Sequence, residues 1–305
     1  VITAPGGDGF SVATAVARNA SNDLRQAGAD VAGCFEHAEP RAHQVLLLLT
    51  DGLGGDQQEV VRGAYSVVGA AVPLVGGCAG DDMAMKRTYQ LFDGKVLEDA
   101  VVGAAISSDM PLGIGVQHGW QRVGNPFLVT ASAGNRVYEL DDRPALDVYA
   151  ERLQAPPEIL TDAAAFTRFA QTHPFGLSRR SGEEVRFIAE ANFEDRSIGC
   201  IAEVPQGGLA WIMEGDTDSV LSATDAACSQ ALEPLQGQMP LGLLAFDCVA
   251  RRGVLGDEGI RNEVERIGLN SGGAPVAGFY TYGEIARTHG VSGFHNQTLV
   301  VLAFA

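Results

Sequence analysis

The sequence has 305 residues, of which 46% are hydrophobic and 19% are charged, and its formal net charge is −17. These are ordinary values for a folded globular protein of one or two domains. The strong negative charge argues against binding to nucleic acid or to an anionic membrane, because both require a basic surface. The five cysteines follow no metal-binding spacing, which favours free thiols in a reducing compartment. We find no membrane-spanning run and no signal peptide, and we expect a cytoplasmic protein.

The first half of the chain shows alternating helix and strand patterns. Apolar residues recur every four positions from Val12 to Leu24, which predicts a helix that ends at Gly28. The apolar run 45–50 predicts a buried strand, and a capping box that begins at Asp56 predicts a helix after it. Further expected elements are a hairpin at 89–97, a strand at 101–106, a hairpin at 127–140 and a helix at 146–153.

The second half begins near Pro156-Pro157, and we place the domain boundary just before it, giving modules 1–153 and 154–305. The stretch from Ala274 to Thr298 reads as glycine-punctuated turns rich in polar side chains, where binding sites are commonly built. The other expected elements are a helix at 163–170, an antiparallel meander at 185–213, a helix at 221–235, a strand at 241–246, a helix at 260–267 and a strand at 299–304.

The two halves repeat the same motifs in the same order. The matching segments are 47–52 with 243–248, 73–76 with 275–278, 80–81 with 283–284, and 101–106 with 299–304. A shared order favours duplication of one unit. It predicts an α+β fold, an α/β sandwich of two similar modules. Each module would have a mixed or antiparallel sheet covered by a helix pair, and the modules would pack sheet to sheet.

Several of these motifs resemble those of a known family. The motifs lie at residues 73–77, 118–120, 138–141, 144–149, 173–176, 247–251, 278–284 and 294–298. The chain resembles the FIST family, in which a FIST N-terminal domain is followed by a FIST C domain. The resemblance implies a bacterial sensory module that binds a small ligand, such as an amino acid, and works with histidine kinases or chemoreceptors. Some members are described as haem-binding nitric oxide sensors, but no haem ligand can be matched to a position here.

The candidate ligand-binding residues cluster in the second half of the chain. Arg251 follows a predicted buried strand and could grip a carboxylate, while Glu284 could bind an ammonium group. Together they would match the two ends of an amino acid. Tyr280, His295 and Asn296 complete this set, and Asn offers both a donor and an acceptor. The alternative at each position is structural: a surface ion pair for Arg251, and a turn cap for Glu284.

His118 and Trp120 could close the same site, although a structural role is the alternative for both. We expect binding without catalysis, and neither a metal nor a cofactor. Two other functions remain open. Cys248 as a nucleophile, with His295 as its base and Asn296 as an orienting group, would make a hydrolase. His118 or His295 as an axial ligand would make a haem sensor.

Overall fold

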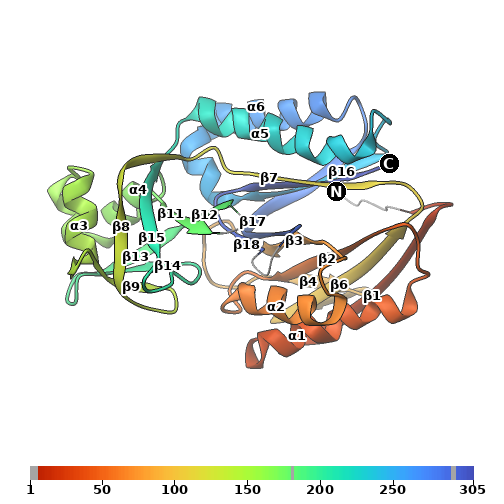
Figure 1. The fold of residues 1–305 in the computed structure, drawn as a ribbon, viewed down its shortest axis with the longest axis horizontal. Helices are drawn as coiled ribbons and strands as arrows, with labels where there is room; N and C mark the ends of the chain where they lie inside the picture. The colour runs from red at the N-terminus through yellow and green to blue at the C-terminus, as the bar shows by residue number, and fades with distance from the viewer. Residues whose placement is uncertain (1–5, 180–181, 290–292) are drawn as a thin grey trace.

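The computed structural model describes residues 6–179, 182–289 and 293–305. Within these ranges the chain forms two large β-sheets and a short hairpin, with helices packed on the sheet faces (Figure 1). The helices are α1 (Leu24–Ala32), α2 (Gln57–Val68), α3 (Ala145–Arg152), α4 (Ala163–Ala170), α5 (Thr217–Leu232) and α6 (Arg252–Asn270). The strands are β1 (Phe10–Arg18), β2 (His43–Asp51), β3 (Leu74–Ala79), β4 (Gln90–Phe92), β5 (Lys95–Leu97), β6 (Ala100–Ser108), β7 (Leu112–Gln117), β8 (Gln121–Ala133), β9 (Arg136–Leu140), β10 (Arg143–Pro144), β11 (Phe175–Arg179), β12 (Gly182–Arg186), β13 (Ile188–Asn192), β14 (Ser197–Cys200), β15 (Leu209–Glu214), β16 (Gly242–Cys248), β17 (Val276–Arg287), β18 (Phe294–His295) and β19 (Leu299–Phe304).

The first sheet is built from two halves with the same topology. Its strand order is β1-β6-β2-β3-β17-β16-β19-β7, and β18 pairs with β17. The pairs β2–β3 and β16–β17 are parallel. The pairs β2–β6 and β6–β1 are antiparallel, and so are β16–β19 and β19–β7. The halves therefore share strand order and direction, which is the arrangement that the internal repeat predicts.

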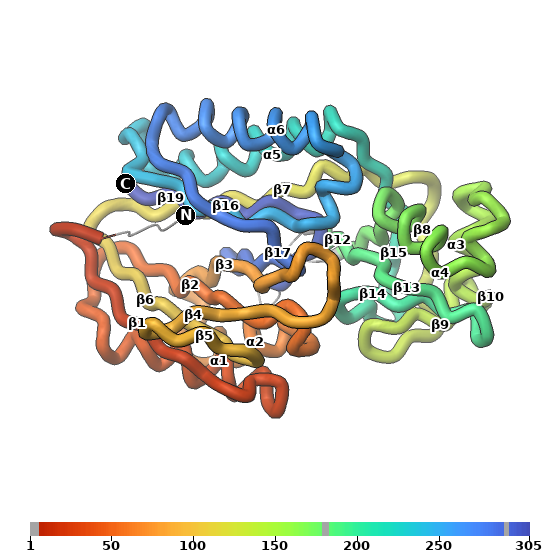
Figure 2. Tube along the Cα trace, turned by 180° about the vertical axis from the view of Figure 1, so that it is seen from behind, coloured from red at the N-terminus to blue at the C-terminus, as the bar shows by residue number. Residues whose placement is uncertain are grey.

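The two halves meet in two ways. β3 pairs antiparallel with β17, so the sheet is continuous. The sheet also curves, so that its halves lie over one another, with α1 and α2 outside one half and α5 and α6 outside the other (Figures 1 and 2). Val45 and Ile106 of one half share a buried cluster with Phe246, Val300 and Leu302 of the other. The predicted sheet-to-sheet packing is confirmed, and it occurs within one hydrogen-bonded sheet.

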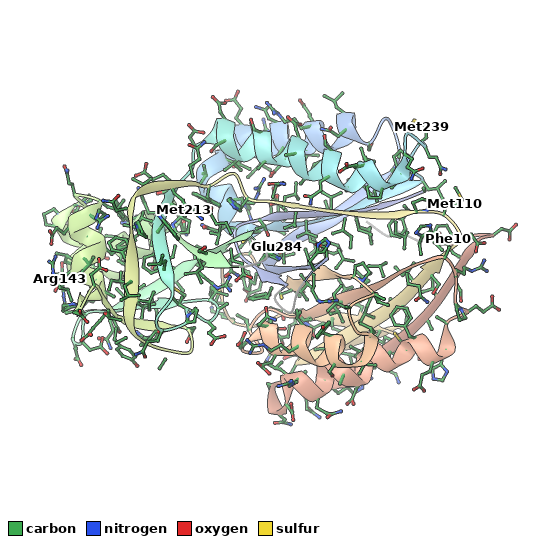
Figure 3. All side chains as sticks on the ribbon, viewed as in Figure 1. Phe10, Met110, Arg143, Met213, Met239 and Glu284 are labelled. Atoms are coloured by element: carbon green, nitrogen blue, oxygen red, sulfur yellow. The ribbon has the colours of Figure 1, made fainter. Side chains whose placement is uncertain are left out.

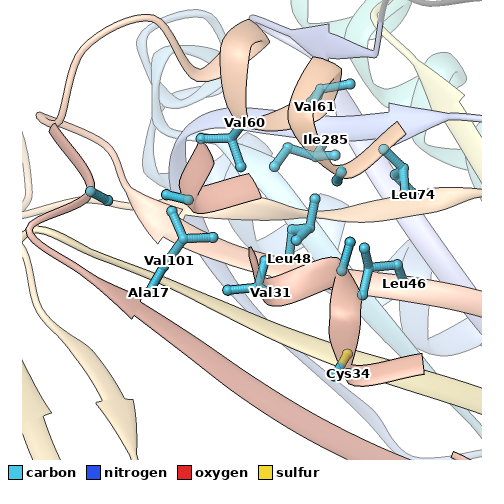
Figure 4. Packing of buried hydrophobic residues seen from close by; sticks show 14 of the residues in the cluster. Ala17, Val31, Cys34, Leu46, Leu48, Val60, Val61, Leu74, Val101 and Ile285 are labelled. Carbon is cyan, nitrogen blue, oxygen red and sulfur yellow. The ribbon is translucent and has the colours of Figure 1, made fainter. Parts of the chain in front are cut away.

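The core beneath α1 and α2 also includes a residue from the C-terminal half. Val31 of α1 and Val60 of α2 pack with Leu48 of β2 in a buried cluster. Ile285 of β17 lies in the same cluster and is fully buried (Figure 4). The long strand β17 of the C-terminal half therefore contributes to the core of the N-terminal half.

The second sheet lies at one end of the molecule, beside α3 and α4 (Figure 1). Its order is β12-β11-β15-β8-β9-β14-β13, with β10 paired to β9. In the chain it is inserted between β7 and α5. The predicted boundary at 153/154 falls within it, because β8 and β9 precede that point and pair with β15 and β14 beyond it.

Two local expectations are wrong. The segment from Val12 to Gly28 is not one helix, since β1 covers residues 10–18 and α1 starts only at Leu24. The stretch from Ala274 to Thr298 is not mainly turns, since residues 276–287 form β17 at the centre of the first sheet. In both places the pairing with neighbouring strands decides the structure.

Candidate functional site

Two adjoining cavities lie where β2, β3 and β16 end. Ligands commonly bind at the carboxyl ends of strands in sheets of this kind. The smaller cavity has a volume of about 50 Å³, and the larger about 320 Å³. Met83, Val249 and Ala250 border both, so together they form one groove, which we call the central site. Its smaller part is also lined by Gly52, Phe187, Ile201, Cys248, Tyr282 and Asn296. Its larger part is also lined by Asp82, Gln171, Arg252, Gly253, Asp257 and Ile260.

Asn296 borders the smaller part of the groove and has an unpaired polar atom. The residue is 1% exposed and lies just before β19. Its Nδ2 donates to the carbonyl of His295 at 3.0 Å. Its Oδ1 is buried and has no hydrogen-bond partner in the described part of the chain. A buried acceptor left unmade costs about 1–3 kcal/mol, so the position calls for a donor from a ligand or a water molecule.

Glu284 lies behind the groove, near the middle of the molecule (Figure 3). It is fully buried and accepts hydrogen bonds from the Thr281 hydroxyl and, at 2.7 Å, from the Thr298 hydroxyl. Burial raises the pKa of Glu284 to about 7, against the hydrogen bonds that lower it. The predicted ammonium contact does not fit this position, because protein hydroxyls already surround the carboxylate.

Cys248 stands between Glu284 and the groove. It is 4% exposed, and its thiol hydrogen-bonds Glu284. Burial, and then the charge of Glu284, raise the pKa of the Cys248 thiol well above its usual value. A reactive cysteine needs a lowered pKa and some exposure. Cys248 therefore has the character of a neutral thiol in the wall of the site.

A loop after β3 covers the groove and is held by Asp81. The carboxylate of Asp81 accepts from the backbone N–H groups of Met85, Lys86 and Arg87 at 2.7–2.9 Å. Tyr282 of β17 donates its hydroxyl to the same carboxylate and accepts from the backbone of Met83 at 2.7 Å. These bonds hold Met83 and Met85 over the smaller cavity.

Arg251 does not face the groove. Its side chain is fully buried, and its Nε lies 2.8 Å from Asp247 Oδ1. Its Nη2 pairs with Glu263 and donates to the Thr224 hydroxyl at 3.0 Å. The predicted grip on a ligand carboxylate is therefore wrong, because protein acceptors already occupy the guanidinium. The surface ion pair considered as its alternative is wrong too, since the partners are interior.

The neighbouring Arg252 borders the larger cavity instead. Its side chain is 39% exposed and its Nη1 lies 2.6 Å from the Asp82 carboxylate. Its guanidinium carbon is 5.3 Å from the ring centroid of Tyr280. Tyr280 itself does not border the central site. An exposed guanidinium beside a groove can exchange its carboxylate partner for one on a ligand.

The two candidate histidines and Trp120 lie behind the site. His118 Nδ1 accepts from the backbone N–H of Trp120 at 2.9 Å, and the indole N–H of Trp120 donates to the carbonyl of Gln297 at 3.1 Å. His295 Nε2 donates to the carbonyl of Ala286 at 2.9 Å. Burial lowers the pKa of both imidazoles. These three residues connect elements of the fold and do not border the groove.

The arrangement does not fit haem at either histidine. An axial ligand must aim a free ring nitrogen into a broad apolar slot. Neither His118 nor His295 borders the central site, so neither aims its second ring nitrogen into that groove. In the described part of the chain, no group of three or more His, Cys, Asp or Glu side chains is placed to hold a metal ion.

The structure brings Cys248 and Asn296 together at the groove, with Glu284 behind them. Sequence reasoning missed Arg252, Tyr282, Met83 and Asp81. Tyr282 could have been included, because it lies in the polar motif that was singled out. Asp81 lies in one of the segments that the two halves repeat, where it matches Glu284, whereas Met83 carried no signal of its own in the sequence.

Sequence comparisons assign the chain to a family. A profile for the FIST N domain matches residues 1–143, and one for the FIST C domain matches residues 145–287. FIST domains are associated with sensing in signal transduction. None of the helices within the described residues is long and apolar enough to cross a membrane.

Similar proteins occur in archaea and bacteria. An uncharacterized protein of Methanocaldococcus jannaschii is 25% identical over 155 residues, which is 48% of this chain and 30% of that protein. An uncharacterized protein in two strains of Mycobacterium tuberculosis is 24% identical over 268 residues, which is 86% of this chain and 68% of that protein. The chain thus spans under a third of the archaeal relative's length. Its two consecutive domain matches show that it belongs to the FIST family, with a FIST N domain followed by a FIST C domain.

Proposed function

We propose that this FIST protein is a sensory module that binds a small polar metabolite at the central site without catalysing a reaction. The observation that carries the proposal is that Asn296 borders the groove and that its buried Oδ1 lacks a partner among the described residues. A ligand donor group would satisfy this oxygen. The raised pKa of Cys248 supports binding over catalysis, because the thiol is poorly suited to act as a nucleophile.

The ligand class follows from the two ends of the groove. Asn296 has an unpaired acceptor, Oδ1, at the enclosed end, and Arg252 offers a cation at the open end. A molecule with an amino or hydroxyl group and a carboxylate, such as an amino acid, would match both. Arg252 takes the carboxylate-binding role first expected of Arg251.

The position of the groove suits a sensor. Gly52 comes from one half of the first sheet, Cys248 from the other half, and Phe187 from the subdomain of the second sheet. A ligand there contacts all three parts. A bound ligand would stabilise the relative arrangement of the three parts that binds it best. A partner protein could detect this change in arrangement.

A thermal-shift screen of amino acids and small hydroxy acids tests the proposal. A ligand present at a hundred times its dissociation constant adds about 2.7 kcal/mol to the free energy of unfolding. Asn296→Ala should abolish the shift, whereas the matched control Asn125→Ala, at an exposed position outside the groove, should keep it. If no compound stabilises the protein, or if Asn296→Ala responds like the unaltered protein, the central site is not the binding site.

Arg252→Ala separates the two ends of the ligand. It should weaken every carboxylate ligand found in the screen and leave amides of the same compounds little changed. Equal weakening of acid and amide would remove Arg252 from the carboxylate contact.

We also propose a cytoplasmic location, and signalling partners such as histidine kinases or chemoreceptors, on the strength of the family. We propose that sensing proceeds without haem, because neither His118 nor His295 borders the central site. Haem reconstitution followed by an absorption spectrum tests this point. A sharp Soret band that His118→Ala or His295→Ala removes would overturn it.

A further inference from the structure

A second cavity, separate from the central site, lies between α6 and the outer face of β16 and β17. Its volume is about 530 Å³, within the range of small-molecule sites. No residue borders both this cavity and the central site. Asp247 borders this one, while the next residue, Cys248, borders the other, because successive side chains of a strand point to opposite faces. We call this cavity the α6 groove.

The walls of the α6 groove are largely apolar. They include Ala245, Val264, Ile267, Val276, Gly278 and Phe279. Val264 is 63% exposed and Phe279 is 40% exposed, so apolar surface remains open to solvent there. Gly278 lets β17 approach β16 closely there, since a Cβ at this position would lie 2.0 Å from the carbonyl oxygen of Ala245.

Two buried carboxyl groups lie in the same lining. Glu263 is 1% exposed and Asp247 is 8% exposed, and both border the groove. Glu263 Oε1 has two partners: it accepts a hydrogen bond from the Thr224 hydroxyl at 2.8 Å, and it forms an ion pair with Arg251. Glu263 Oε2 is buried without a hydrogen-bond partner in the described residues. An apolar groove with an unused buried carboxylate oxygen calls for a ligand that carries a donor group.

Arg251 neutralises only one of the two carboxylates. Within the described residues, its guanidinium is the cation that contacts both of them. When the α6 groove holds no cation, burial raises the pKa of Asp247, so that Asp247 keeps its proton while Glu263 stays ionised beside Arg251. An ammonium group could take the place of this proton. Tyr280 also borders the groove and adds to its lining.

We infer that the α6 groove is a second binding site, for an apolar organic amine whose ammonium group contacts Glu263 and Asp247 and whose hydrocarbon part lies between α6 and β17. The inference does not rest on the proposed function, because the two sites have no lining residue in common.

Calorimetric titration of the whole chain with n-octylamine, 1-octanol and octanoate tests the inference. High salt is needed to screen the ammonium group from the acidic surface. We expect one octylamine per chain, bound at least about tenfold more tightly than octanol, and no binding of octanoate. Octanol that binds as tightly as octylamine, or an absence of octylamine binding, would overturn the inference.

Two variants locate the site. Gly268 borders the groove on α6 and has nothing within 4 Å of the position of its missing Cβ, so Gly268→Leu should fill the groove without disturbing the fold. It should weaken octylamine at least about tenfold, whereas Leu269→Ala, at a 79% exposed neighbour outside the lining, should not. Glu263→Gln should remove the preference for octylamine over octanol. Wild-type affinity in Gly268→Leu would place the amine elsewhere and refute the assignment.

Discussion

At the scale of single residues, Arg251 is a buried charge whose effect on stability depends on the side chains around it. It carries a charge into a fully buried position and is held there by Asp247, Glu263 and Thr224. Removing one member of a buried ion cluster costs more than the cluster contributes as a whole, because uncompensated charge remains behind.

Arg251→Ala should therefore lower the free energy of unfolding by about 3–5 kcal/mol. Arg252→Ala, at the next position but 39% exposed, should cost less than about 1 kcal/mol. Urea denaturation of both variants measures the contrast. Equal costs would mean that the buried pairing contributes no more than the exposed one.

Glu284 gives a prediction about pH. Burial raises its pKa from 4.5 to about 7, so the folded protein binds this proton more tightly than the unfolded chain. The contribution of Glu284 to stability is therefore fully present below its unfolded pKa and is lost as the pH rises from 4.5 to about 7. Glu284→Gln should remove this loss, because glutamine does not ionise. The free energy of unfolding of the variant minus that of the wild type should therefore increase by about 3 kcal/mol as the pH rises from acidic to mildly alkaline values. The exposed Glu258→Gln serves as the control, and a pH-independent difference for Glu284→Gln would contradict the raised pKa.

At the scale of elements, two glycines allow α1 and α2 to pack backbone to backbone. A Cβ at Gly63 of α2 would lie 1.8 Å from the carbonyl oxygen of Arg25, and one at Gly28 of α1 would lie 2.1 Å from that of Val60. No side chain fits between the two helices at these points. The packing of α1 on α2 over the sheet therefore depends on glycine there.

Gly63→Ala should destabilise the protein by about 1–3 kcal/mol, although alanine is the better helix former. Gly268→Ala is the matched control, since it also lies within a helix but has open space around its Cβ position. It should stabilise the protein by up to about 1 kcal/mol. If close packing of the helices is the cause, thermal unfolding should show a lower melting temperature for Gly63→Ala and a higher one for Gly268→Ala. Changes of the same sign in both variants would mean that close packing is not the cause.

At the scale of the whole molecule, the two halves of the first sheet share one core. Leu302 of β19 is fully buried in the cluster that also holds Val45 of β2. Leu302→Ala should cost about 2–5 kcal/mol. The loss should appear as equal decreases in amide hydrogen-exchange protection in β2 and β19 if the halves unfold together. A decrease confined to the C-terminal half would show that the halves open separately. The control Leu241→Ala, at a 62% exposed position, should leave the protection of both β2 and β19 unchanged.

The sequence alone predicted the elements whose signals are local. The runs at 45–50, 241–246 and 299–304 became β2, β16 and β19, and the helix at 163–170 became α4 with the same bounds. These segments combine apolar runs with clear caps or turns, so their neighbours in the chain suffice to define them. The order of motifs in the two halves also predicted that the halves would be similar, and they share one strand order because matching units fold in matching ways.

Tertiary structure decided the elements whose local signals are ambiguous. A spacing of four residues, as from Val12 to Leu24, fits both the period of a helix and twice the period of a strand, and pairing with β6 made its first part β1. β17 carries glycines and polar residues because it packs closely against β3 and β16 and supplies side chains to the site.

The same division holds for the site. The density of polar groups in residues 274–298 indicated Glu284 and Asn296 directly, and both lie at or behind the central site. The sequence could not tell that Arg251 turns into the interior while Arg252 borders the groove, because adjacent residues differ only in the direction that the fold gives them. Residue chemistry therefore followed from the sequence, whereas the side of the sheet that each residue faces, and so its role, was set by the packing of α5, α6 and the second sheet around β16 and β17.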